Sequence, residues 1–361
     1  MPKPPHLFID ISSHGFGHLA ITAPVINTLG KLLPELHLTI RSLLPPAKLS
    51  QRIQLPFERI ASATDFGYVM IDATHIDLPA SAVAYRRAHA DWPGRVAAES
   101  AFLKTLAPDL VLSNVSYLPL AGAARAGIPS LALCSLNWAD LFGHFFGHEN
   151  WAPAIHSEML AAYNGAKAFL RVTPGMAMPA LESLTDIGPI AALGQRHDLG
   201  LGSDKAVLVA LGGIAHRLPV ESWSRLPGIR WLVPADWHCQ HPDAIALDSF
   251  GLGFTDLLAS VDAIVTKPGY GTFTEAACNG TPVLYQLRED WPEQDCLIAW
   301  LRDNARCLEV DAAQLQNGEI GGALDALWRQ AAPARPDTSG SVQAAKLIAA
   351  RLSAARPTAG A

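Results

Sequence analysis

The chain has 361 residues, of which 50% are hydrophobic and 17% are charged, and its formal net charge is −6. This length is sufficient for two domains that each bury a core of their own. The acidic balance argues against a nucleic-acid-binding protein, which normally presents a basic face, so we expect no nucleic-acid partner.

The cysteine pattern argues against disulfides and zinc. The five cysteines show no C-x-x-C spacing: Cys134, Cys239, Cys278, Cys296 and Cys307. We expect reduced, buried thiols. His144 and His148 have the i, i+4 spacing of a helical metal pair, but no third ligand accompanies them, so we expect no metal. The first residues lead directly into one short strand, and no run reaches the roughly 18 apolar residues of a membrane span. We therefore expect a cytoplasmic protein.

The first half of the chain alternates between apolar strand-like runs and helix-like segments. Residues 6–11 and 36–40 predict two strands around a helix that ends before Pro34, which is a βαβ unit. Further strands are expected over 109–114, 130–136 and 168–172, with helices over 80–106 and 121–126 and a strand-like piece at 67–71. This alternation predicts one doubly wound domain.

The loop after the first strand, SSHGFGH (12–18), places two glycines between two histidines. With Ala20, the glycines match the G-x-G-x-x-A fingerprint of dinucleotide-binding loops. That fingerprint requires an acidic residue after the second strand, where Arg41 stands, although NADP would tolerate an arginine. Unperturbed histidines titrate near neutrality, and they suit an approaching acceptor hydroxyl better than a pyrophosphate. The alternative is that they only cap backbone groups.

The second half begins after a polar, glycine-containing linker at 195–205. A buried strand over 206–211 ends in Gly212 and Gly213, and later strands are expected at 229–233, 261–265, 283–285 and 306–310. Helices are expected over 273–279, 296–304, 315–330 and 342–352. This second alternation predicts another parallel α/β array.

The turn TKPGYGTFTEAA (266–277) joins a buried strand to a helix. A helix N-terminus carries unpaired N–H groups and partial positive charge, so a diphosphate would bind there. Glu275, about one turn into the helix, would reach the hydroxyls of a ribose. The alternative is an ordinary tight turn without a ligand, because short glycine motifs are weak evidence.

The motifs at 267–275, 280–282 and 290–295 resemble the donor-binding segment of glycosyltransferase-B enzymes. The similarity is closest to the glycosyltransferase-like domains of arabinokinase-type proteins, and it extends to the peptidoglycan N-acetylglucosaminyltransferase and galactolipid synthase group. The loop at 12–18 resembles the opening of the same arabinokinase-type domains. Pro268 departs from their pattern.

The resemblance implies a role for each matching residue. The donor nucleotide would contact Gly212, Gly213, Phe254, Lys267, Gly269, Tyr270, Gly271, Thr272 and Glu275. The donor sugar would contact Glu293, Gln294 or Asp295. His18 is the best match for a catalytic base, and His14 is the second.

The aromatic segment 137–151 follows a strand and contains His144 and His148. It would either bind a sugar or a lipid-linked acceptor, or only pack a helix under the domain. The acceptor-side residues expected from this segment and the first loop are Gly15, Phe16, Gly17, Asn137, Trp138 and His144.

Together these features predict an α/β fold of two doubly wound Rossmann-like domains facing across a cleft, the glycosyltransferase-B fold. The expected domains are 1–195 on the acceptor side, 205–340 for the nucleotide sugar, and 341–361 as a helix crossing back to the first domain with a loose tail. The expected function is metal-independent glycosyl transfer from a nucleotide-diphosphate sugar, most simply a UDP-sugar, to an unidentified hydroxyl acceptor, with no cofactor. A lipid-linked acceptor would bring the protein to the inner membrane surface. A sugar-nucleotide epimerase and a non-catalytic nucleotide-sugar binder remain as alternatives.

Overall fold

The computed structural model describes residues 3–214 and 216–354, so the loose end expected over 354–361 lies outside the described residues from 355 onward. The described chain forms two compact units. The first contains residues 3–69, 76–190 and 339–354, and the second contains Met70–His75 and Ala191–Thr338. None of the helices in the described residues is long and apolar enough to cross a lipid bilayer.

The first unit is built on a seven-stranded parallel sheet with the order β3-β2-β1-β4-β5-β6-β7. Its strands are β1 His6–Ile11, β2 His37–Arg41, β3 Glu58–Ile60, β4 Leu110–Asn114, β5 Ser130–Cys134, β6 Phe169–Val172 and β7 Leu184–Ile187. The central strands β1, β4 and β5 are buried along their whole length, as expected for parallel strands covered on both faces.

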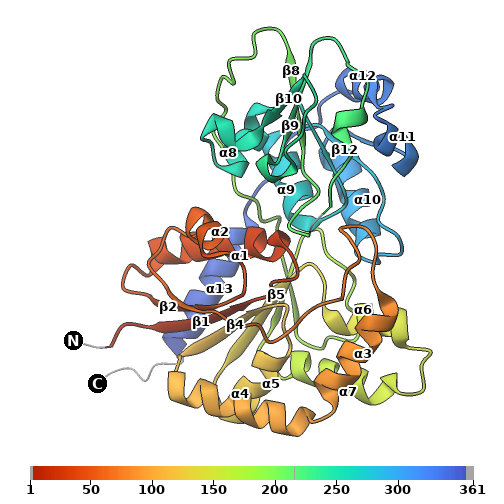
Figure 1. Cartoon of the computed structure of the whole chain (residues 1–361). Coiled ribbons are helices and arrows are strands. Elements are labelled where there is room, and N and C mark those ends of the chain that lie inside the picture. The colour runs from red at the N-terminus through yellow and green to blue at the C-terminus, as the bar shows by residue number, and fades with distance from the viewer. Residues whose placement is uncertain (1–2, 215, 355–361) are drawn as a thin grey trace. The chain divides into compact units, whose positions relative to one another are not determined.

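Helices cover both faces of this sheet (Figure 1). On one face lie α1 (Phe16–Leu32), α2 (Pro46–Arg52) and α13 (Gly340–Ala354), and on the other lie α4 (Trp92–Leu106) and α5 (Leu118–Ala126). The remaining helices of this unit are α3 Leu78–His89, α6 Trp138–Phe146 and α7 Ala152–Asn164. The last helix, α13, packs against the first, α1, so the two ends of the described chain belong to one unit.

Two local predictions for the first unit were wrong. The single helix expected over 80–106 is two helices, because Asp91 caps α4 by accepting from the amide of Gly94 and Pro93 occupies its first turn. The strand-like piece at 67–71 is reduced to a bridge residue at Met70. Gly67 has a φ of +61°, which interrupts an extended backbone there.

The second unit is built on a six-stranded parallel sheet with the order β10-β9-β8-β11-β12-β13. Its strands are β8 Lys205–Val209, β9 Ile229–Val233, β10 Ala244–Ala246, β11 Ala263–Thr266, β12 Val283–Tyr285 and β13 Cys307–Glu309. Its α-helices are α8 Phe254–Ser260, α9 Tyr270–Asn279, α10 Gln294–Asn304, α11 Ala312–Asn317 and α12 Gly321–Arg329. Three short 3₁₀ turns lie at Val220–Ser222, Ala235–Trp237 and Leu247–Phe250.

A short piece of the early chain, Met70–His75, is part of the second unit. Ala73 is fully buried in the core that contains Val209, Val265 and Leu284. The carbonyl of Thr74 accepts a hydrogen bond of 3.1 Å from the amide of Glu289. The second unit is therefore assembled from two separate stretches of sequence.

A buried ion-pair network lies at the carboxyl ends of β1 and β2. Arg41 donates to Asp10 at 2.5 Å and to both carboxylate oxygens of Glu99 at 2.5 and 3.0 Å. All three residues are buried. Burial alone would lower the pKa of Arg41, but the two carboxylates outweigh it and raise that pKa. The network therefore ties β1 and β2 to α4.

Replacing Arg41 by Met should destabilise the first unit by about 3 kcal/mol, because two buried carboxylates lose their counter-charge. Urea denaturation followed by circular dichroism measures the change, and hydrogen exchange of β1 and β2 localises it. Arg302→Met is the matched control, since Arg302 and Glu309 form an exposed pair at 3.6 Å and its loss should leave the transition unchanged. Equal effects of the two substitutions would contradict a structural role for the buried network.

Candidate functional site

In each sheet the direction in which successive strands are added reverses once. Most of the predicted site residues follow the strands on either side of that reversal. In the first sheet the order reverses between β1 and β4, and in the second between β8 and β11. Open α/β sheets bind ligands outside the carboxyl ends of the strands that flank such a reversal. His18 follows β1, and Lys267 follows β11. Each unit thus has one candidate site.

In the first unit, His18 lies in the first turn of α1 and contacts the end of β4. Its Nδ1 is 2.9 Å from Oδ1 of Asn114. The amide nitrogen of Asn114 donates to the carbonyl of His18 at 3.2 Å and to the hydroxyl of Thr22 at 2.7 Å. Since the amide nitrogen is engaged in this way, the amide oxygen faces the imidazole. Nδ1 of His18 is therefore the protonated nitrogen, and Nε2 carries the lone pair.

The environment of His18 keeps its imidazole neutral. The side chain is nearly buried, with 8% of the residue exposed. Burial lowers its pKa to about 4, although the hydrogen bond with Asn114 opposes the shift. An amide orients the ring without offering the negative charge that would stabilise an imidazolium. The result is a fixed tautomer of reduced basicity.

The ring of Trp138 contacts both loop histidines. Its ring makes edge contacts with His14 and His18, at centroid distances of 5.3 and 6.0 Å, and its indole N–H donates to Asp65 at 2.7 Å. Burial, followed by the negative charge of Asp10, raises the pKa of Asp65 to about 6. A Cβ at Gly67 would lie within 2.5 Å of the His14 ring, so the glycine allows this loop to pack closely. The sequence did not indicate Asn114 or Asp65 as neighbours of the histidines.

The other acceptor-side residues have mainly structural positions. Gly15 is the N-cap of α1, with Phe16 and Gly17 in its first turn. Asn137 caps α6 by accepting from the amide of Asp140 at 2.8 Å, and Trp138 is completely buried. His144 is exposed on α6. The aromatic rings of α6 are buried, which favours packing over a stacking surface, although Phe145, Phe146 and Trp151 border a hollow of about 320 Å³ beside α3.

Arg41 weakens the dinucleotide alternative. It is engaged by Asp10 and Glu99 inside the first unit. A 2′-phosphate would have to compete with two buried carboxylates for this guanidinium.

In the second unit, the loops after β8 and β11 meet at Lys267. A Cβ placed on Gly212 would lie 3.8 Å from Nζ of Lys267, and one on Gly269 would lie 3.6 Å from it. Gly212 has a φ of +94°, which L side chains rarely adopt, so the first loop requires glycine there. Gly269 is the N-cap of α9, whose first residues are Tyr270, Gly271 and Thr272. The ammonium of Lys267 and the loop containing Gly212 therefore lie close together at the N-terminus of α9.

The ammonium of Lys267 is destabilised in this position. Burial, followed by repulsion from Arg288, lowers its pKa to about 7, while Glu293 opposes the shift. A bound anion would reverse both effects, because it would replace the lost solvation and offset the repulsion.

Arg288, which follows β12, is the residue of this region that the sequence analysis missed. It is 6% exposed, and its Nε and Nη2 have no hydrogen-bond partner among the described residues. Its guanidinium lies 3.7 Å from the ring centroid of Trp291, whose N–H donates to Glu293 at 3.1 Å. A single arginine after a short strand gives no pattern in sequence, so only its burial identifies it.

The predicted sugar-binding residues lie beside Arg288 and differ in exposure. Glu293 is buried and Asp295 is exposed. The side chain of Gln294 accepts from the amide of Arg288 at 3.0 Å and donates to its carbonyl at 3.1 Å. Both polar groups of this side chain are thus engaged in holding the backbone of Arg288.

The two remaining nucleotide residues differ in exposure. Glu275 is only 1% exposed, so a ribose would reach its carboxylate only after the covering side chains move. Phe254 is the first residue of α8 and is half-buried.

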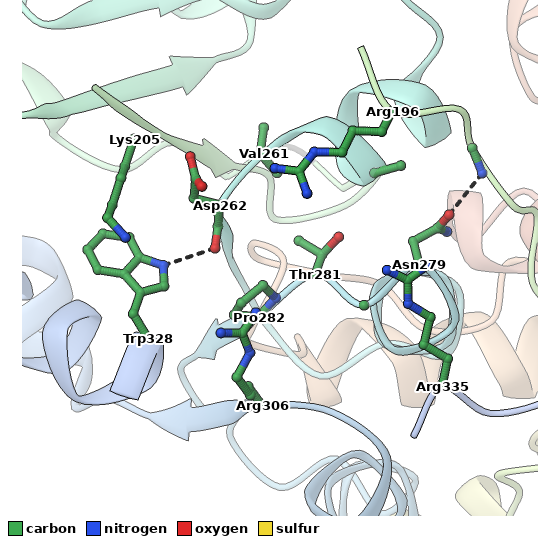
Figure 2. Close-up of a pocket in the computed structure, with 13 residues that line it drawn as sticks. Arg196, Lys205, Val261, Asp262, Asn279, Thr281, Pro282, Arg306, Trp328 and Arg335 are labelled. Atoms are coloured by element: carbon green, nitrogen blue, oxygen red, sulfur yellow. Dashed lines mark hydrogen bonds between the residues drawn. The ribbon is translucent and has the colours of Figure 1, made fainter. Parts of the chain in front are cut away.

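A cavity of about 240 Å³ lies at the opposite, amino-terminal edge of the second sheet (Figure 2). Figure 2 shows Arg196, Arg306 and Arg335 around Thr281 and Pro282, with Lys205 beside Trp328. The cavity is lined where α8, α9, α10 and α12 end. Helix C-termini carry partial negative charge, which accounts for basic side chains there without any ligand.

Comparison with known proteins gives one curated relative. No protein-family model matches the sequence. The chain is 21% identical to L-arabinokinase of Arabidopsis thaliana over 361 residues, covering 94% of this chain. It spans 33% of the length of that relative. The similarity is therefore distant and partial.

Several solved structures share the fold. The calicheamicin glycosyltransferase CalG4 is 17% identical with a TM-score of 0.67, covering 99% of this chain and 100% of that one. The glycotransferase of kitacinnamycin is 18% identical with a TM-score of 0.63, covering 97% and 100%. S. aureus MnaA, solved with UDP, is 11% identical with a TM-score of 0.61, covering 97% of each chain. Together with the two parallel sheets, these similarities confirm the expected fold class, which glycosyltransferases share with UDP-N-acetylglucosamine 2-epimerases.

Proposed function

We propose that the protein transfers a sugar from a nucleoside-diphosphate donor to a hydroxyl acceptor. The observation that carries this proposal is the convergence of Gly212, Gly269 and Lys267 at the N-terminus of α9. Amide N–H groups, a helix dipole and an ammonium stabilise the negative charge that grows on a departing diphosphate.

Recognition of the nucleotide follows from the same elements. The diphosphate binds the turn formed by Gly269, Tyr270, Gly271 and Thr272, with Gly212 and Gly213 opposite. Glu275 binds the ribose after its covering side chains shift, and Phe254 lies beside the base. Glu293 and Asp295 remain the proposed sugar ligands. Among the proteins of this fold, MnaA was solved with UDP and VinC with dTDP, which supports a pyrimidine nucleotide.

His18 is the proposed general base. Its hydrogen bond with Asn114 leaves the lone pair on Nε2, so this nitrogen accepts the proton as the hydroxyl attacks. The low pKa of the free site keeps the imidazole unprotonated at neutral pH. His14, which shares the contact with Trp138, is the second candidate.

Epimerization is the second candidate function, because UDP-N-acetylglucosamine 2-epimerases share the fold. An epimerase would interconvert two nucleotide sugars without an acceptor. Chromatography of the nucleotide sugars after incubation separates the two reactions.

UDP or dTDP should raise the melting temperature of the protein by several degrees at 100 times the dissociation constant, which corresponds to about 2.7 kcal/mol of stabilisation. NADP should have little effect. Gly212→Val is expected to abolish the shift, because valine is strained at a positive φ and crowds Lys267. A larger shift with NADP than with either nucleoside diphosphate would contradict the proposal.

His18→Gln should lower the rate of nucleoside-diphosphate release from the donor by about 100-fold or more, because the proton acceptor is lost. Binding of UDP by isothermal titration calorimetry should remain unchanged. His197→Gln is the matched control, since His197 is exposed and belongs to no proposed site. An unchanged rate in the His18 variant would make the base assignment wrong.

The acid limb of the rate profile should lie near pH 4, because His18 becomes protonated only as the pH falls through its lowered pKa of about 4. Asn114→Asp should move this limb upward by about 1–3 pH units, since a carboxylate stabilises the imidazolium. Asp65, with its pKa of about 6, also titrates in this unit, so NMR of the His18 ring nitrogens should accompany the kinetics. A His18 pKa that stays the same in Asn114→Asp would contradict the proposed hydrogen bond.

A further inference from the structure

Arg288 is a buried cation without matching acceptors. It is 6% exposed, and neither Nε nor Nη2 has a hydrogen-bond partner among the described residues. One contact of its guanidinium is with the face of Trp291 at 3.7 Å, which supplies attraction but no lone pair. Buried guanidinium N–H groups left without acceptors destabilise the folded state. The folded chain nevertheless keeps the guanidinium of Arg288 buried.

Arg288 also faces a second cation. Repulsion from Arg288 contributes to the lowered pKa of Lys267, and burial lowers the pKa of Arg288 itself to about 10. Attraction by Glu293 opposes both shifts without cancelling them. Two positive charges and the N-terminus of α9 therefore carry the same sign at the carboxyl edge of the second sheet.

The basic cavity at the amino edge provides a contrast within the same unit. There, Arg196, Arg306 and Arg335 face helix C-termini, whose partial charge is negative. At the carboxyl edge the helix charge adds to that of Lys267 and Arg288. Since Nε and Nη2 of Arg288 have no hydrogen-bond partner among the described residues, this edge is suited to bind an added negative group.

The backbone of Arg288 is held in place. Gln294 bonds both its amide and its carbonyl, and the ring of Trp291 covers the guanidinium. Because its backbone is hydrogen-bonded and its guanidinium is stacked on a ring, the side chain of Arg288 loses little conformational entropy when it binds a ligand. The N–H groups on Nε and Nη2, which have no partner among the described residues, suit the paired oxygens of a phosphate or carboxylate.

We propose that Arg288 and Lys267 together bind an oxyanion of the donor, so that Arg288 is a binding residue of the proposed donor site. This inference rests on the proposed function. Two parts of a donor offer the required chemistry: the distal phosphate of the diphosphate, and the carboxylate of a uronic-acid sugar. The phosphate would make Arg288 a stabiliser of the leaving group, and the carboxylate would make it the residue that selects an acidic sugar.

Isothermal titration calorimetry with UMP, UDP, UDP-glucose and UDP-glucuronate separates these sources. Arg288→Met should weaken binding of the affected ligands by about 10- to 100-fold, as expected for charged hydrogen bonds. A phosphate contact weakens UDP and both UDP-sugars but spares UMP. A carboxylate contact weakens UDP-glucuronate alone. Arg288→Lys should retain part of the affinity, because it keeps the charge but loses the fork of donors.

The thermal stability of the ligand-free variants distinguishes binding from structure. Arg288→Met should be as stable as the wild type or more stable, because the attraction of Glu293 does not offset the burial of this charge. Arg306→Met is the matched control, since it removes a cation of the same unit at the opposite edge and should leave all four affinities unchanged. Wild-type affinities in Arg288→Met would overturn the inference while leaving the proposed function intact. Failure of the wild type to bind UDP would remove the proposed function and the inference with it.

Discussion

The reversal of strand order in each parallel sheet is the constraint on which both candidate sites depend. Crossovers that run in opposite directions from β1 and β4 leave their carboxyl ends uncovered, and the same holds for β8 and β11. Loops that leave these strands must therefore meet, whatever their sequences. This is why the side chain of His18 lies within hydrogen-bond distance of Asn114, and why a Cβ placed on Gly212 would lie 3.8 Å from Nζ of Lys267. Substitutions at these positions change the chemistry of the site, while the topology of the sheet determines that the loops lie close together.

Parallel topology also gives each sheet two electrically different edges. Helices that follow strands begin near the carboxyl edge and end near the amino edge, so their dipoles make the first edge positive and the second negative. A basic side chain is therefore attracted to the helix ends at the amino edge and repelled by those at the carboxyl edge. Arg335 packs against Gly280 at the end of α9, where a cation stabilises the helix. Arg288 lies at the other edge, where the partial charge of the helix ends has the same sign as its own.

Much of the fold was readable from the sequence because parallel strands buried on both faces are continuous apolar runs. The strands at 6–11, 229–233 and 283–285, the glycine turn and the helix after it were found in this way. The break between α3 and α4 was also readable, since Asp91 and Pro93 form a helix start, but the alanine-rich composition obscured it. Partners distant in sequence were not readable. Asn114 sits in an ordinary buried strand, and the burial of Trp138 and Arg288 depends on side chains that only the folded chain brings near them.

The second unit includes Met70–His75, and the first is completed by α13. Each unit is therefore interrupted, and its parts emerge from the ribosome at widely separated times. A nascent chain that has reached residue 338 has Ala73 available for the second core but lacks the helix that covers α1. A fragment limited to 191–338 would lack the methyl group that fills that core and the carbonyl that accepts from Glu289. Neither unit is one continuous stretch of sequence, so neither can be excised whole as a single segment of the polypeptide.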